Sequence, residues 1–316
     1  MLPLWVFLGI TGILFAIGGT MFDKYLLERY FNKSDCGNKN DNSGPGALII
    51  FSALFVVPVV LLVIICRYDT VDFSLHTGVI GMLTGATNGL WILLYLHAMS
   101  RADVSKVVPL FQTVPVFGLI FGMIILEEYL TMPQILSATV IMSGAIILMY
   151  RRSSGRLGLD VKTMSLMVGA SCLVALSHVM FKFIAVDTNY WTATFWLGIG
   201  FALFGTLLFA VFGAYRRQFR SLLGKRRFRI VGLNGVNELF DNAGELIFLA
   251  AVVLGPVALV QSINAYEPML IFLICLVLMR IWPAYFREDI SIPALVQKFC
   301  GIAVISVGSI FLYTSI

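Results

Sequence analysis

The sequence predicts an all-α polytopic membrane protein with ten transmembrane helices in two inverted five-helix repeats around a central cavity. Of its 316 residues, 59% are hydrophobic and only 12% are charged, about half the charged fraction of a typical soluble domain. The mean hydropathy of +0.93 requires a bilayer, because so few charged side chains cannot coat this much apolar surface. The other two observations are the long apolar runs and an internal repeat.

Ten segments come close to the roughly 20 apolar residues that cross a bilayer. In chain order they are 3–22, 46–66, 77–97, 104–126, 133–150, 164–185, 192–213, 230–252, 257–279 and 294–314. Some contain glycine and proline, which spanning helices tolerate where neighbours satisfy the freed backbone groups. In the first segment Gly12, Ala16 and Gly19 predict a close packing face. The polar stretch from Asp23 to Gly46 is predicted to be a mobile loop.

The second half of the chain repeats the first. A shift of 153 residues places Tyr95 on Phe248 and Pro115 on Pro268, and a shift of 164 places Gly144 on Gly308. Five helices per repeat would give the two halves opposite orientations, as in many secondary transporters. The predicted division is a first repeat at 1–150, a basic connector at 151–163 and a second repeat at 164–316.

The basic residues indicate the topology. Of the 22 lysines and arginines, 20 lie in or beside the odd-numbered connectors, and only Arg67 and Lys182 lie elsewhere. Under the positive-inside rule the odd connectors are cytoplasmic, including the basic stretch 216–229, and both termini lie outside. The net charge of +5 therefore marks topology in a multi-pass plasma (inner) membrane protein and does not indicate nucleic-acid binding.

The stretch SRADVSKVVPLFQTVPVFGLIFGMIILEE (100–128), followed by Gln134 and Gly144, resembles the EamA-like family of the drug/metabolite transporter superfamily. The pattern recurs as GPVALVQSINAYEPMLIFLICLVLM (255–279), then Gln297, Gly301 and Gly308, although Arg280 stands where the first copy has Glu127. The resemblance covers nearly the whole chain. It implies ten helices, a central cavity and transport of a small metabolite, and it names no substrate. It also implies cytoplasmic termini, against the charge pattern.

The eighth segment is unusually acidic for a membrane span. Glu238, Asp241, Asn242 and Glu245 follow one another at helical spacing and fall largely on one face. Each carboxylate would cost about 2.5–3.5 kcal/mol at the bilayer centre, so this face is predicted to line the cavity. The repeat shift brings Asn88 of the third segment onto Asp241.

Further polar and aromatic residues lie on the third, fourth and ninth segments. Trp91 and Tyr95 are one turn apart and could stack on a substrate, although such residues are equally common in the core or the lipid belt. Gln112 and Asn264 lie near the two prolines, where a kink could expose carbonyl groups. The predicted substrate-binding residues are Asp241, Glu238, Asn88, Trp91, Tyr95, Gln112, Asn264 and Asn242.

Coupling or charge balance is assigned to Glu245, Lys24, Lys182 and His178. A shift of 158 residues relates the two lysines, and His178 lies one turn before Lys182. The lysines could neutralise the acidic helix or bind an anionic substrate group. They could also extend to the membrane interface, because both lie near helix ends. Glu127 and Glu128 are interpreted as a helix end or a salt bridge.

The sequence predicts a secondary carrier of a small metabolite, an amino acid or an amine, that works by alternating access. Proton-coupled and facilitative transport both remain open, and so do a lipid or lipid-linked-precursor flippase and a structural subunit. The sequence contains no HExxH, GxSxG or Walker pattern, so no enzymatic activity, metal or cofactor is expected. The expected partners are membrane lipids and a small-molecule substrate, without nucleic acid, for a monomer or homodimer.

Overall fold

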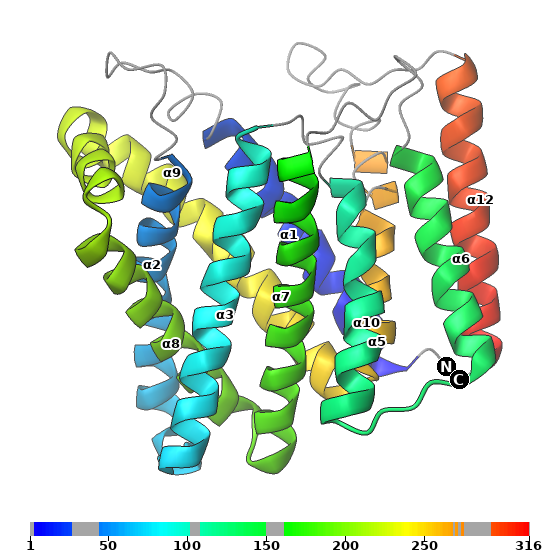
Figure 1. The fold of residues 1–316 in the computed structure, drawn as a ribbon, viewed down its shortest axis with the longest axis horizontal. Coiled ribbons are helices and arrows are strands. Elements are labelled where there is room, and N and C mark those ends of the chain that lie inside the picture. Colours follow the sequence, from blue (N-terminus) through cyan, green and yellow to red (C-terminus); the bar gives the residue numbers. More distant parts are fainter. Residues whose placement is uncertain are drawn as a thin grey trace.

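The computed structural model describes residues 3–26, 44–101, 108–149, 161–267, 269–270, 273–274 and 292–315, and within these ranges the ordered elements are helices (Figure 1). The α-helices are α1 Leu4–Leu26, α2 Gly44–Arg67, α3 Leu75–Met99, α5 Val114–Ile125, α6 Met132–Met149, α7 Val161–Asp187, α8 Tyr190–Val211, α9 Gly213–Leu254, α10 Val257–Ser262 and α12 Ile292–Ser315. The 3₁₀ turns are η2 Tyr68–Thr70, η3 Val108–Thr113 and η4 Ile263–Tyr266. The predicted all-α class is confirmed. Of the predicted loop 23–46, residues 27–43 lie outside the described part.

Five stretches of the described chain are long and apolar enough to cross a membrane. They are Pro45–Thr70, Leu75–Met99, Val161–Asp187, Tyr190–Val211 and Leu295–Leu312. Shorter apolar helices lie at Leu4–Gly19, Leu110–Ile125 and Met132–Ile147. The protein is therefore an integral membrane protein.

The helix α9 differs from the prediction. The predicted span 230–252 and the predicted connector 216–229 form one continuous helix of 42 residues. Lysine and arginine are good helix formers, so a basic sequence does not by itself end a helix. At 1.5 Å per residue, α9 is about 63 Å long, roughly twice the thickness of the hydrocarbon core.

The predicted fourth and ninth segments are each divided. The turn η3 precedes α5, and Pro115 occupies the first turn of α5, where its missing N–H group costs no helical hydrogen bond. In the ninth segment α10 passes into η4. Its proline, Pro268, lies outside the described residues. The polypeptide therefore leaves regular α-helix at two places next to the cavity described below.

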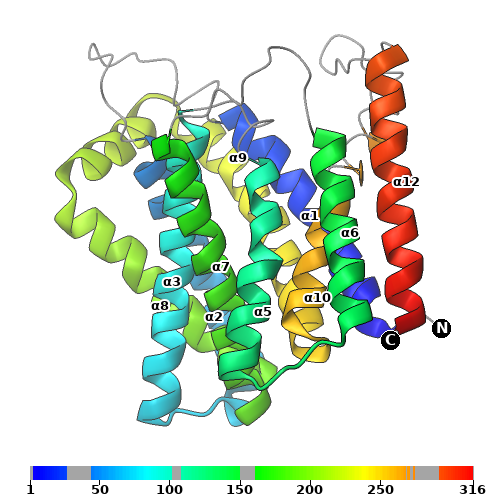
Figure 2. The same ribbon diagram turned by 45° about the vertical axis from the view of Figure 1, so that its right-hand side comes forward.

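The helices pack in a defined set of pairs. α1 packs on α9, α3 on α7 and α8, α2 on α8 and α9, α5 on α7 and α10, and α6 on α12. Figure 2 shows α6 and α12 side by side at one end of the molecule. At the α1–α9 crossing a Cβ added to Gly12 would lie 2.9 Å from the Gly244 carbonyl oxygen, so the backbones approach as the small residues of the first segment predicted.

The connector between α2 and α3 is tied to the start of α8. The Asp72 carboxylate accepts hydrogen bonds from Ser74 Oγ at 2.7 Å and Thr77 Oγ1 at 2.8 Å. The Asp72 N–H donates to Thr192 Oγ1 at 3.0 Å, and Trp196 Nε1 donates to the Asp72 carbonyl at 2.8 Å. These bonds hold the α2–α3 connector against the first turns of α8 at one end of the helix bundle.

Candidate functional site: a central polar cavity

A cavity of about 300 Å³ lies between the helices. Its walls come from α1, α2, η3, α3, α5, α7, α8, α9 and η4. One wall is acidic and belongs to α9, and another is aromatic and belongs to α3 and η3. Polar groups inside a membrane protein are costly and mark functional positions, so this cavity is the candidate site.

The acidic wall is built from consecutive turns of α9. Glu238 is buried, with 6% of its surface exposed. Its carboxylate accepts a hydrogen bond from Ser52 Oγ of α2 at 2.5 Å and one from Asn242 Nδ2 at 3.3 Å. Asp241 accepts from Asn237 Nδ2 at 3.1 Å and lies against Gly19 of α1, where an added Cβ would collide with its carboxylate. Both carboxylates are thus held in defined positions at the cavity.

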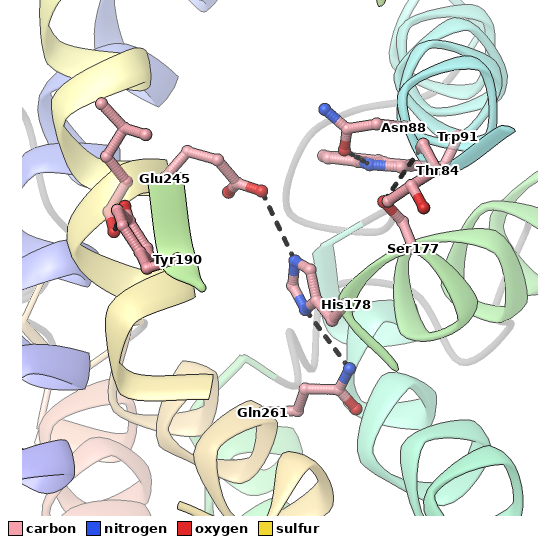
Figure 3. A network of polar contacts seen from close by, with 9 residues as sticks. Thr84, Asn88, Trp91, Ser177, His178, Tyr190, Glu245 and Gln261 are labelled. Carbon is pink, nitrogen blue, oxygen red and sulfur yellow. Dashed lines mark hydrogen bonds and ion pairs between the residues drawn. The ribbon is translucent and has the colours of Figure 1, made fainter. Parts of the chain in front are cut away.

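A second polar group joins α9, α7 and α10 (Figure 3). His178 is 4% exposed, and its Nε2 lies 3.5 Å from Glu245 Oε1. Its Nδ1 lies 3.3 Å from Gln261 Nε2. With Gln261 as donor, Nδ1 is the acceptor and the ring hydrogen is on Nε2, which faces Glu245. Beside them, Tyr190 Oη donates to the Leu246 carbonyl at 2.7 Å and fixes this part of α9 to α8.

The aromatic wall contains Trp91, Tyr95 and Phe111. The Trp91 ring centroid lies 6.2 Å from that of Tyr95 and 6.1 Å from that of Phe111. Tyr95 and Phe111 are 5.1 Å apart. Trp91 Nε1 donates to Asn88 Oδ1 at 2.6 Å, so the indole is fixed and its only polar atom is satisfied.

The structure brings most of the predicted residues to this cavity. The predicted residues that line it are Asn88, Trp91, Tyr95, His178, Glu238, Asp241, Asn242, Glu245 and Asn264. Gln112 is buried and does not line it. Lys24 belongs to α1, but its side chain lies outside the described residues. Their functional roles stay predictions.

The partner predicted for Lys182 is wrong. Its ammonium does not line the cavity and instead lies 2.5 Å from Glu128 Oε1, while it also donates to the Gly255 carbonyl at 2.7 Å. The physical reason is the turn after α5, where Glu127 has φ of 55° and directs the chain back, so that Glu128 reaches α7. The salt-bridge interpretation of Glu128 is confirmed.

Three lining or supporting residues are not among the site residues predicted from the sequence: Ser52, Gln261 and Glu267. Ser52 and Glu267 line the cavity, and Gln261 orients His178. The signal for Glu267 was present in the sequence, since a carboxylate inside a predicted span marks a functional position. A single serine in an apolar run gives no comparable signal.

The fold and the cavity are those of a helical membrane protein with a polar interior. Residues 40–150 match the model of the EamA-like transporter family, which belongs to the drug/metabolite transporter superfamily, so the resemblance seen in the sequence is confirmed over this stretch. Among solved structures 28 chains match. One, described only as the crystal structure of a protein, has a TM-score of 0.59 at 15% identity over 98% of this chain and 96% of its own, which establishes a shared fold. No curated protein sequence gives a significant match.

Proposed function

We propose that the protein is a secondary transporter that carries a small metabolite, an amino acid or an amine, through the central cavity by alternating access. The observation that carries this proposal is the cavity of about 300 Å³, whose walls combine helices of both halves of the chain and include four carboxylates, of which that of Glu238 is buried. A site between two repeats is where alternating-access carriers bind substrate. One chain supplies all of this wall, so a monomer is sufficient.

We propose further that the two halves, 1–150 and 164–316, are inverted five-helix repeats. The α6–α12 contact supports this. A Cβ added to Gly144 would lie 2.8 Å from Ile305 Cγ1, and one added to Gly308 would lie 2.7 Å from Ile141 Cγ1. A shift of 164 residues relates both the two glycines and the two isoleucines, so exchanging the halves maps this contact onto itself.

The remaining helix pairs support the same exchange. If α1, α2, α3, α5 and α6 correspond to α7, α8, α9, α10 and α12, then the packing of α1 on α9 corresponds to that of α7 on α3. In the same way α2 on α9 corresponds to α8 on α3. The pairs α2–α8, α5–α10 and α6–α12 correspond to themselves, as pairs on a twofold axis do.

For orientation we propose that the odd connectors face the cytoplasm of a plasma (inner) membrane. In Figure 1, α1 begins and α12 ends on the side of the α5–α6 connector. That side holds few basic residues, because 20 of the 22 lysines and arginines belong to the odd connectors. A reporter enzyme fused to the C-terminus tests this: activity in the cytoplasm would contradict it.

A carrier fits the cavity better than a lipid flippase does. A flippase needs cationic contacts for lipid headgroups, whereas none of the described residues that line the cavity is lysine or arginine. The pair His178 and Glu245 supplies titratable groups for proton coupling.

The test uses purified protein in sealed liposomes, screened with radiolabelled amino acids and amines at two pH values. Asp241→Asn should abolish or strongly reduce transport, while Glu127→Gln, which removes a carboxylate outside the cavity, should not. If Asp241→Asn leaves transport and its pH dependence intact, Asp241 has no role in it. If no solute of either class moves, the protein is not such a carrier.

A further inference from the structure

Apart from His178, the ionisable groups with a formal charge among the described residues that line the cavity are acidic. The described lining includes the acidic residues Glu238, Asp241, Glu245 and Glu267, and neither lysine nor arginine. Lys182 of α7 does not face the cavity. Its ammonium lies 2.5 Å from the Glu128 carboxylate and donates a hydrogen bond to the Gly255 carbonyl at 2.7 Å. Within the described residues, the cavity therefore offers acceptors for a cation and no permanent cation for a carboxylate.

Glu245 is the acidic residue best placed for a ligand. Its side chain is 33% exposed, yet its Oε1 atom is buried and has no hydrogen-bond partner among the described residues. The facing His178 Nε2 atom, in a side chain that is 5% exposed, also lacks a hydrogen-bond partner there. Buried polar atoms are normally paired, and a ligand donor is one way to satisfy Glu245 Oε1. Figure 3 shows Glu245 across from Asn88 and Trp91, with His178 between the two sides.

The opposite wall suits a flat apolar group. The rings of Trp91, Tyr95 and Phe111 lie 5.1–6.2 Å apart and form one continuous aromatic cluster. Aromatic faces attract cations and pack on other rings. A volume of about 300 Å³ is at the small end for ligand sites, which suits a molecule with one ring.

We infer that the substrate class is an organic cation, such as a primary amine, that carries one aromatic or apolar ring, and not a zwitterionic amino acid. The ammonium group donates to Glu245, with Glu238 nearby on the same wall, and the ring lies against Trp91, Tyr95 and Phe111. The carboxylate of an amino acid would meet these acidic side chains, and no lysine or arginine is among the described residues that line the cavity. This inference rests on the proposed transporter function. That proposal allows an amino acid or an amine as the substrate, and the inference selects the amine.

Binding to the purified full chain tests this with four ligands that differ in charge or in the presence of the ring: phenethylamine, phenylalanine, phenylacetate and ethylamine. We expect phenethylamine to bind at least about tenfold more tightly than each of the other three, because a charge-assisted hydrogen bond or a buried ring is worth about that factor. Glu245→Gln should weaken phenethylamine binding about tenfold, and Trp91→Leu should weaken phenethylamine more than ethylamine. Glu127→Gln, outside the cavity, is the matched control and should bind as the wild type does.

Uptake into sealed liposomes separates this inference from the proposed function. Uptake of phenethylamine and exclusion of phenylalanine support both. If phenylalanine enters the liposomes as well as phenethylamine does, the cation inference is wrong and the carrier function stands. If phenethylamine binds but no ligand crosses, the carrier function is wrong and the cation site stands. Absence of both binding and uptake overturns both. Trp91→Leu gives an independent reading if Glu245→Gln does not fold.

Discussion

The Lys182 ammonium lies 2.5 Å from the Glu128 carboxylate, and this ion pair joins the two halves of the chain. Lys182 is the second-half partner and is 9% exposed, while Glu128 follows the last turn of α5 in the first half. Glu128 also accepts a hydrogen bond from the Val257 N–H group at the start of α10, at 2.9 Å. One carboxylate therefore fixes α7 and α10 to the α5–α6 connector.

Glu128→Gln should destabilise the protein by about 3 kcal/mol, because it leaves the buried Lys182 charge without its counterion. Thermal unfolding of the purified protein in detergent measures this. The control is Glu127→Gln, which removes the neighbouring carboxylate. Replacing both partners, in Glu128→Gln with Lys182→Met, should recover most of the loss, since no buried charge remains. A double variant as unstable as the single one would show that the pair does not act as a unit.

Gly118→Ala should disrupt the orientation of His178. A Cβ at Gly118 would lie 1.9 Å from Gln261 Oε1, so the amide that contacts His178 must move. We expect transport to fall several-fold and its pH profile to shift, measured in liposomes across pH 5 to 8. On the same helix, Gly122→Ala is the matched control, because its nearest neighbour would be Glu128 Oε2 at 3.5 Å, an ordinary contact.

Gly122→Ala should even stabilise α5, by about 0.5–1 kcal/mol, because alanine loses less backbone entropy in a helix. If Gly118→Ala and Gly122→Ala show the same transport rate and the same pH profile, the Gln261–His178 contact has no role in transport.

Ser52→Ala should destabilise the protein by about 2 kcal/mol. It removes a hydroxyl donor at 2.5 Å from the buried Glu238 carboxylate, and hydrogen bonds to charged groups are worth about that much. Thermal unfolding in detergent again provides the measurement. Ser306→Ala is the control, since Ser306 is exposed and donates only to the Ile302 carbonyl of its own helix. Since alanine is a better helix former than serine, helix propensity alone would stabilise both variants. A loss of similar size in both variants would show that the contact with Glu238 is not its cause.

The acidic wall could be predicted from sequence because it depends on one helix alone. Glu238, Asp241, Asn242 and Glu245 share a face by their spacing, and three carboxylates on a membrane span must avoid lipid. The position of Asn88 at the cavity could also be predicted, because the repeat shift aligns Asn88 with Asp241.

The predictions that failed have different causes, and one of them depends on a contact between distant segments. The partner of Lys182 could not be predicted, because Glu128 lies 54 positions earlier and reaches α7 only through the left-handed turn at Glu127. Gln112 was placed at the cavity by its distance from Pro115, but the 3₁₀ turn η3 rotates its side chain differently from an α-helix. The length of α9 was missed because charge was taken as the end of a helix.

Asp72 should make stability depend on pH at the acid end. Hydrogen bonds from Ser74 and Thr77 hold the pKa of the Asp72 carboxyl below its ordinary value of 3.8. A carboxyl whose pKa is lowered by folding stabilises the folded state above its ordinary pKa, and this contribution disappears as the pH falls through the lowered value. Asp72→Asn should therefore lower the unfolding temperature at pH 7, and the difference from wild type should shrink below about pH 4. Asp69→Asn removes an exposed carboxylate from the same connector and is the control. A difference for Asp72→Asn that stays constant from pH 7 to pH 3 would show that the ionised carboxylate is not what holds the connector.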